Sequence, residues 1–217
     1  MKFVRLPAQT LLLLMAVVAF AACGSDSTGP STGGGGTGGG GTGGGSGSGG
    51  GGGEVPTLPE VPPAAQIFTD DIDAENGGVG QLNYDAWAHW NVVEGCVDLH
   101  GPGSLNPLPG NGVYIDMDGS CMNAGTMETK TTFDLAVGDY TLEFLIAGNN
   151  QVAGSDTLDV SVGSVMSERI ILDWQEPLAL MSFDFNVGST TTGKIRLEHL
   201  GGDEQGILID AVRLRRN

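Results

Sequence analysis

Hydrophobic and polar residues alternate one by one over much of the C-terminal two thirds of the chain. In residues 140–146, Tyr, Leu, Phe and Ile alternate with Thr, Glu and Leu. The same period recurs in shorter runs at residues 113–118, 157–162, 181–187, 195–198 and 207–214. A period of two places successive side chains on opposite faces of an extended chain, as in a β-strand with one buried face. The pattern therefore predicts a series of short strands.

Turn-forming residues separate these runs. Clusters of Gly, Asn, Asp and Pro occupy residues 109–112, 137–139, 148–150, 187–189 and 201–203. No stretch shows a helical stripe of useful length, and residues 165–174 are the single ambiguous segment. Many short strands with turns between them are typical of an all-β fold, here an antiparallel β-sandwich.

The N-terminal quarter has a different composition. Residues 24–63 hold about half of the 38 glycines and show no hydrophobic period. Such a segment buries too little apolar surface to offset its ordering entropy, so it is expected to be a disordered linker. Its last part, residues 54–63, is rich in proline and predicts a stiffer polyproline stem. One domain of about 150 residues, 64–217, remains for the sandwich.

The first 23 residues carry a targeting pattern. Lys2 and Arg5 precede an apolar run at 11–20, and two alanines precede Cys23. This pattern describes a secretory signal, and its ending on cysteine resembles the bacterial lipoprotein signal, although Phe20 stands where that family usually has leucine. The resemblance implies that residues 1–22 are removed, that Cys23 is acylated, and that the protein is anchored in the cell envelope, at the outer membrane or cell surface. A plain secretory signal with an incidental Cys23 is the alternative.

Charge narrows the range of partners. The chain carries 26 acidic and 9 basic residues, a net charge of −17, and removing residues 1–22 takes away two basic residues and no acidic ones. A surface this acidic argues against nucleic acid and against anionic lipid headgroups as partners.

Two cysteines remain in the predicted domain. Because Cys96 and Cys121 form an even pair in an exported protein, a disulfide between them is expected; two buried thiols are the alternative. Two cysteines and three scattered histidines do not make the four-ligand set of a structural zinc site.

Several segments, in this order, resemble the galactose-binding-like jelly roll of extracellular carbohydrate-binding modules. The resemblance rests on residues 67–71, 90–92, 97–99, 113–119, 140–149 and 206–214. It covers nearly all of the predicted domain and implies the jelly-roll form of the sandwich, but it is weak for any one ligand because this fold serves many functions.

Carboxylates near the start of the domain suggest a cation. Asp71, Asp73 and Glu75 lie in a short acidic segment that ends on glycine, and clustered carboxylates suit Ca²⁺. The jelly-roll resemblance implies a structural calcium between this segment and the last strand, which adds Asp210 as a ligand. A solvated acidic edge is the alternative for the segment, and a buried, hydrogen-bonded carboxylate for Asp210. The pair Asp116 and Asp118 either binds a cation or sugar hydroxyls or, more commonly, closes a strand with a turn.

Aromatic and amide side chains supply the candidates for sugar binding. Tyr84 and Trp87 lie in a polar segment, where they are expected to be exposed and to stack on pyranose rings, whereas Trp90 is expected in the core. Asn149 and Asn150 form a polar loop suited to a binding edge, or only a turn.

No catalytic signature emerges. The chain has no nucleophile motif such as G-x-S-x-G and no phosphate-binding loop. The lipoprotein and jelly-roll resemblances together imply a membrane-anchored, non-catalytic module that binds extracellular or envelope polysaccharide. A structural or adhesive protein with a protein partner is the alternative, and a hydrolase is a weaker third option, because no carboxylate pair stands out.

Overall fold

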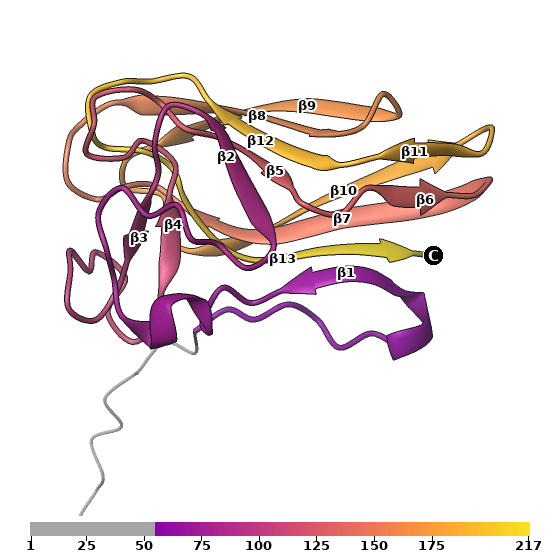
Figure 1. The fold of residues 1–217 in the computed structure, drawn as a ribbon, viewed down its shortest axis with the longest axis horizontal. Helices are drawn as coiled ribbons and strands as arrows, with labels where there is room; N and C mark the ends of the chain where they lie inside the picture. Colours follow the sequence, from indigo (N-terminus) through magenta and orange to yellow (C-terminus); the bar gives the residue numbers. More distant parts are fainter. Residues whose placement is uncertain (1–54) are drawn as a thin grey trace, which may run out of the picture. The chain divides into compact units, whose positions relative to one another are not determined.

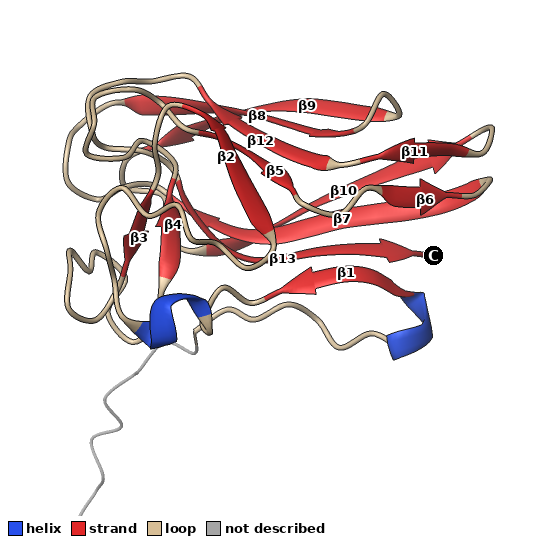
Figure 2. Cartoon of the chain, in the orientation of Figure 1, coloured by secondary structure: helices blue, strands red, loops and turns tan. Residues whose placement is uncertain are grey.

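A computed structural model describes residues 55–217. The signal, Cys23 and the glycine tract lie outside these residues. In the described part no helix is long and apolar enough to cross a bilayer. Apart from two short 3₁₀ turns, η1 (Pro63–Ala65) and η2 (Glu75–Gly78), the regular structure consists of strands (Figure 2).

Two antiparallel sheets face each other (Figure 1). The first sheet runs in the order β10 (Ala179–Val187), β7 (Gly138–Ala147), β13 (Leu208–Arg216), β4 (Tyr114–Asp116), β3 (Asp98–His100), with β1 (Gln66–Asp70) paired to β13. The second runs β2 (Trp90–Glu94), β5 (Thr126–Thr129), β12 (Ile195–His199), β8 (Ser155–Val162), β9 (Met166–Asp173). A small third sheet joins β6 (Phe133–Leu135) to β11 (Thr191–Gly193). The predicted all-β antiparallel sandwich is confirmed, and the ambiguous segment 165–174 contains strand β9.

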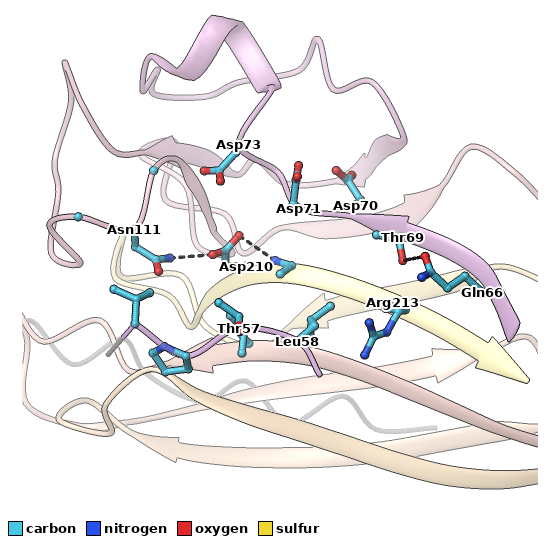
Figure 3. A pocket seen from close by; sticks show the side chains of 16 residues that line it. Thr57, Leu58, Gln66, Thr69, Asp70, Asp71, Asp73, Asn111, Asp210 and Arg213 are labelled. Atoms are coloured by element: carbon cyan, nitrogen blue, oxygen red, sulfur yellow. Dashed lines mark hydrogen bonds between the residues drawn. The ribbon is translucent and has the colours of Figure 1, made fainter. Parts of the chain in front are cut away.

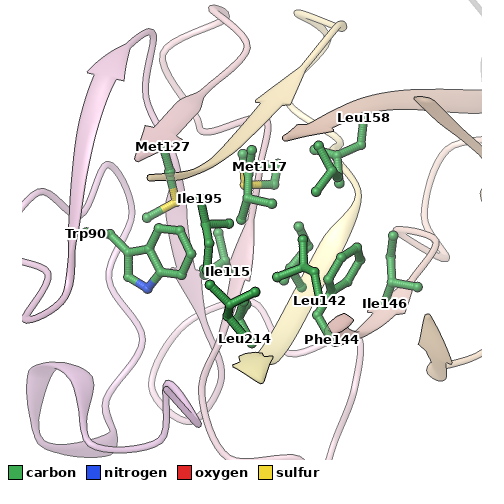
Figure 4. Packing of buried hydrophobic residues seen from close by; sticks show 14 of the residues in the cluster. Trp90, Ile115, Met117, Met127, Leu142, Phe144, Ile146, Leu158, Ile195 and Leu214 are labelled. Carbon is green, nitrogen blue, oxygen red and sulfur yellow. The ribbon is translucent and has the colours of Figure 1, made fainter. Parts of the chain in front are cut away.

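The alternating residues form the core between the sheets (Figure 4). From β7, Leu142 and Phe144 are fully buried and meet Leu158 and Leu197 of the second sheet within one cluster. Each such side chain contributes about 1.5–3 kcal/mol on burial. Trp90 is fully buried in the same cluster, as expected.

The last strand departs from simple alternation. The pairing of β13 with β7 shifts between Asp210 and Arg213, and Ala211 has φ +46°. This β-bulge changes the phase of the strand, so Ile209 on one side and Val212 on the other both belong to the core. The sequence alternation had placed residues 209 and 212 on opposite faces. Asp210 and Ala211, at the bulge, line a cleft.

The expected disulfide is present. Cys96 and Cys121 are bonded, with their Cα atoms 6.2 Å apart. The bond joins the segment that enters β3 to the loop that follows β4.

Candidate functional site

A cleft of about 390 Å³ lies beside the bulge of β13 (Figure 3). One wall is the segment that leaves β1, another is the loop before β4, and a third is the stem. The lining residues are Val55, Pro56, Thr57, Leu58, Gln66, Thr69, Asp70, Asp71, Asp73, Gly110, Asn111, Gly112, Leu145, Asp210, Ala211 and Arg213.

Asp70 shapes the acidic wall. Its Oδ1 accepts a hydrogen bond from the backbone N–H of Ile72 (3.1 Å), and its Oδ2 accepts one from the indole N–H of Trp90 (2.8 Å). Ile72 has φ +64° and is fully buried, so the chain turns sharply here. The turn leaves the side chains of Asp71 and Asp73 exposed. Asp70 therefore has a structural role.

The loop before β4 approaches this wall closely. The backbone N–H of Val113 donates to Asp73 Oδ1 at 3.2 Å. Gly112 has φ +69°, and a Cβ there would lie 1.7 Å from the same oxygen. Both the backbone conformation and the close approach require glycine at this position. Burial and the neighbouring Asp71 charge raise the pKa of Asp73, and its bond to Val113 opposes them.

Asp210 lies at the base of the cleft. Its Oδ2 accepts a hydrogen bond from Asn111 Nδ2 (2.7 Å), and its Oδ1 accepts one from the backbone N–H of Ala211 (2.8 Å). Burial raises its pKa to about 7; the negative charges of Asp73 and Asp71 contribute, and the bond to Asn111 opposes them. Three carboxylates thus repel one another around one cavity.

Arg213 does not neutralise this charge. Its side chain is buried, and its Nε donates to Glu143 Oε1 at 2.5 Å, with Nη2 also paired to that oxygen. It is the single basic side chain among the lining residues. Because it is committed to Glu143, the cleft keeps a net negative charge.

The stem forms the third wall. Within it, burial alternates: Pro56 and Leu58 are half-buried, while Val55, Thr57 and Pro59 are exposed. After the turn η1, Gln66 ties the stem to β1, because its Nε2 donates to the Val61 carbonyl (3.3 Å) and its Oε1 accepts from Thr69 Oγ1 (3.2 Å).

The structure brings three of the four predicted calcium ligands to the cleft. Asp71, Asp73 and Asp210 line it, but Glu75 does not. Glu75 is buried elsewhere, where it accepts hydrogen bonds from the Tyr84 hydroxyl (3.2 Å) and the Ala88 backbone N–H (2.7 Å). Within residues 55–217, no three His, Cys, Asp or Glu side chains are grouped so that they could hold a metal ion.

The predicted exposure of the sugar-stacking aromatics is wrong. Tyr84 is 6% exposed and Trp87 is 1% exposed. Their rings pack edge to face at 4.9 Å, and the Trp87 indole N–H donates to the Tyr84 carbonyl at 2.8 Å. Both therefore belong to the core in spite of their polar neighbours. No aromatic side chain is among the residues that line the cleft.

Asn149 and Asn150 also lie away from the cleft. Asn149 is buried, and its Oδ1 accepts from the backbone N–H groups of Gln151 (2.8 Å) and Val152 (3.0 Å), which makes it a turn-forming residue. Asn150 is exposed, with φ +53°.

A second group of acids surrounds two histidines beneath the loop 200–206. Asp116 Oδ2 pairs with His100 Nε2 at 3.0 Å, and Asp116 Oδ1 accepts from the backbone N–H groups of Asp118 and Gly206. Asp118 Oδ2 accepts from the N–H groups of Gly202 and Asp203. The turn-closing role of Asp116 and Asp118 is therefore the one observed. The second histidine, His199, has its pKa lowered by burial, against the nearby carboxylates. The sequence indicated the pair Asp116 and Asp118 but not its grouping with His100 and His199, because these residues come from distant segments.

Proteins similar to this chain are found among solved structures. No protein-family model matches the sequence, and no curated protein matches it. Among solved structures, a carbohydrate-binding module from Cellvibrio mixtus lichenase 5A with bound cellotriose is 13% identical, with 70% of this chain and 98% of that chain covered and a TM-score of 0.37. A family 35 carbohydrate-binding module from Clostridium thermocellum is 12% identical, with 63% and 95% covered and a TM-score of 0.37.

Larger enzymes contain a similar portion. An arabinose-bound α-L-arabinofuranosidase is 10% identical, with 62% of this chain covered and a TM-score of 0.39. The chain spans only 24% of the length of that enzyme. The neighbours thus include separate carbohydrate-binding modules as well as a portion of a longer enzyme.

Proposed function

We propose that this chain is a lipid-anchored protein of the cell envelope whose domain is a non-catalytic carbohydrate-binding module. The observation that carries the proposal is the cleft beside Asp210. It combines carboxylate, amide and hydroxyl groups with apolar surface in one cavity of about 390 Å³. Sugars offer hydroxyl groups to the polar side chains and C–H faces to the apolar ones, and ligand sites typically combine such groups.

The charge of the cleft narrows the class of sugar. Asp71, Asp73 and Asp210 line it, and Arg213 is paired with Glu143. Carboxylates accept hydrogen bonds from hydroxyl groups and attract ammonium groups, whereas they repel other carboxylates. In the absence of a bound cation, neutral and amino sugars therefore fit the cleft, and uronic acids do not.

Calcium is part of the proposal as a structural ion. Asp71, Asp73 and Asp210 are hard oxygen ligands that line one cleft, but they are not grouped closely enough in this structure to hold an ion together, so binding would require them to draw closer. A cation beside them would relieve the repulsion that contributes to the raised pKa of Asp210. With calcium bound, the cleft would lose much of its negative charge and its repulsion of uronic acids.

Acylated Cys23 is the proposed anchor. Several acyl chains on one residue bind a bilayer far more firmly than a single chain. Mass spectrometry of the membrane fraction tests this directly: a lipid-modified N-terminal Cys23 is expected, and an unmodified N-terminus at another residue contradicts it.

Sugar binding is tested with the full chain on an array that contains cellotriose, β-1,4-galactotriose, a glucosamine trisaccharide and a galacturonic acid trisaccharide. In chelator we expect binding to neutral or amino sugars and none to galacturonic acid, and Asp210→Ala should weaken it. Absence of binding to every sugar, with and without calcium, would falsify the proposal. Release of reducing ends from a bound sugar would contradict its non-catalytic part.

One observation favours a second function. Tyr84 and Trp87 are buried, so the aromatic platform expected for sugar stacking is absent from the cleft. A structural or adhesive module with a protein partner does not need such a platform. Cross-linking on intact cells distinguishes the two, because this alternative requires a cross-linked protein that free sugar does not displace.

A further inference from the structure

The stem is a wall of the cleft as well as a connection to the domain. Val55, Pro56, Thr57 and Leu58 all line the cavity. They reach it because the turn η1 (Pro63–Ala65) reverses the chain, and Gln66 bonds back to the Val61 carbonyl on the other side of that turn. In Figure 3, Thr57 and Leu58 lie across the cavity from Asp71 and Asp73.

The stem also supplies three of the five apolar side chains that line the cleft. The acidic wall and Asn111 provide polar groups, and the base adds only Leu145 and Ala211 to the apolar part. The remaining apolar side chains are Val55, Pro56 and Leu58. Pro56 and Leu58 are half-buried, so each presents one side to the cavity and keeps part of its surface exposed.

We infer that residues 55–58 are a functional part of the binding site, with the Pro56 ring and the Leu58 side chain forming the surface on which the C–H face of a sugar packs. This inference rests on the proposed function and deepens it. In the absence of an aromatic platform, a rigid proline ring offers a flat apolar face with little conformational entropy to lose. A domain cut at residue 64 would lack this wall.

The stem also connects the cleft to the linker. Because the stem connects the domain to the segment that follows Cys23, a force on that segment acts first on a wall of the cleft. Binding and the position of the stem are then linked: a sugar that contacts both walls holds the stem in place, and displacement of the stem lowers affinity.

The test uses the full chain with three substitutions in the stem. Pro56→Gly and Leu58→Ser alter the wall, and Pro59→Gly is the matched control because Pro59 is exposed and does not line the cleft. Titration calorimetry with cellotriose and with the glucosamine trisaccharide should show at least a tenfold loss of affinity for the first two variants. The control should stay within twofold of the unsubstituted chain, and all three should keep the same melting temperature within 2–3 °C.

Two results separate failure of this inference from failure of the proposed function. If the unsubstituted chain binds a trisaccharide and Pro56→Gly and Leu58→Ser bind it as well as Pro59→Gly does, the stem is not part of the site, while the sugar function stands. If the unsubstituted chain binds no sugar, the proposed sugar function is wrong, and so is the proposed role of the stem in binding sugar. Amide chemical shifts of Leu145 and Ala211 then still report the packing: they should move in Pro56→Gly and not in Pro59→Gly, and unchanged shifts overturn the placement of the stem as well.

Discussion

Two groups of aspartates lie in this domain, and their surroundings differ in one respect. Beneath the loop 200–206, both carboxylates accept backbone hydrogen bonds, and Asp116 also pairs with His100. In the cleft, Asp71 is exposed, Asp210 is held by Asn111 and its own neighbour, and the nearby Arg213 is paired elsewhere. The carboxylates of the buried group are held by backbone N–H groups, although His100 Nδ1, Asp118 Oδ1 and His199 Nδ1 have no hydrogen-bond partner within residues 55–217. The cleft group instead presents an exposed carboxylate, Asp71, to an external ligand.

Burial shifts the pKa of an aspartate in the same direction in both groups. It raises the pKa of Asp116 and of Asp210 alike, because a desolvated carboxylate favours its neutral form. The neighbouring groups act differently in the two places. The bond to His100 lowers the pKa of Asp116, whereas the charges of Asp73 and Asp71 raise the pKa of Asp210 further. A buried aspartate thus indicates structure or binding according to its partners, and residue type alone does not distinguish them.

The largest effect is expected in the buried group. Asp116→Ala removes the partner of His100 and leaves the backbone N–H groups of Asp118 and Gly206 without their acceptor. Removing one member of a buried pair costs about 3–5 kcal/mol. Urea unfolding should show this loss, with Asp71→Ala, an exposed position, within about 0.5 kcal/mol of the unsubstituted chain. A loss below about 1 kcal/mol for Asp116→Ala would remove the distinction between the two groups.

The next largest effect is expected from loss of the disulfide, which lies beside the strands that carry the buried group. Cys96 and Cys121 flank the strands β3 and β4, which carry His100 and Asp116. Replacing both cysteines by serine should destabilise the domain by about 3 kcal/mol, from the entropy of a loop with a sequence separation of 25. Thermal melts with and without reductant measure it, and the double variant should lose its sensitivity to reductant.

Much of the fold was predictable because it depends on local patterns. Alternating residues in 140–146 and 157–162 lie in β7 and β8, and the pairing of Cys96 with Cys121 was expected from their even number in a chain whose N-terminal pattern predicts export. The burial of Trp87 was not predictable, because its indole N–H is satisfied by the Tyr84 carbonyl in a loop whose side chains are otherwise polar.

The site was predictable in part. The sequence predicts Asp71, Asp73 and Asp210 as members of one cation site, and all three line the cleft. The sequence did not indicate the bulge at Ala211, since a bulge depends on how two strands pair. It also did not indicate the stem wall, since Pro56 and Leu58 lie in a segment without a hydrophobic run. These features arise from tertiary contacts that no local pattern specifies.

Addition of calcium tests whether the carboxylates of the cleft bind a cation. A ligand at 100 times its Kd stabilises the folded state by about 2.7 kcal/mol. Thermal melts at pH 8 should show a rise with calcium for the unsubstituted chain and a much smaller rise for Asp210→Asn. Asp134→Asn is the control, because Asp134 is exposed and does not line the cleft. An unchanged melting temperature at millimolar calcium would contradict the proposed ion site.

The pH dependence of Asp210 follows from its pKa of about 7 against an ordinary value of 3.8. Between these values the folded state binds the proton and the unfolded state does not, so this group lowers stability as pH rises from about 4 to 7 and leaves it constant above. In chelator, the stability of Asp210→Asn relative to the unsubstituted chain should therefore rise between pH 4 and pH 8 by at most about 4 kcal/mol, since the shift is about three pKa units and one unit corresponds to about 1.4 kcal/mol.

Melts of the Asp210→Asn variant and the unsubstituted chain at matched pH isolate this contribution from other titrating groups such as Asp156, whose pKa is raised to about 6 by burial and by the charge of Asp203. The gain should disappear near pH 4, where Asp210 is protonated in the folded state and half-protonated in the unfolded one. A gain of equal size at pH 4 and pH 8 would show that ionisation of Asp210 is not its cause.

The smallest effect is expected at the edge of the buried group, where two adjacent asparagines differ. Asn149 Nδ2 donates to Asp156 Oδ2 (3.2 Å) and to the Gln205 carbonyl (3.3 Å), whereas Asn150 is exposed. Because Asn150 has φ +53°, Asn150→Gly keeps the backbone conformation and should change stability by less than about 0.5 kcal/mol. Asn149→Ala should cost about 1–3 kcal/mol by leaving buried groups unpaired. Since neither residue lines the cleft, sugar affinity of the folded variants should match that of the unsubstituted chain, and a selective loss of binding in Asn150→Gly would move the binding edge to this loop.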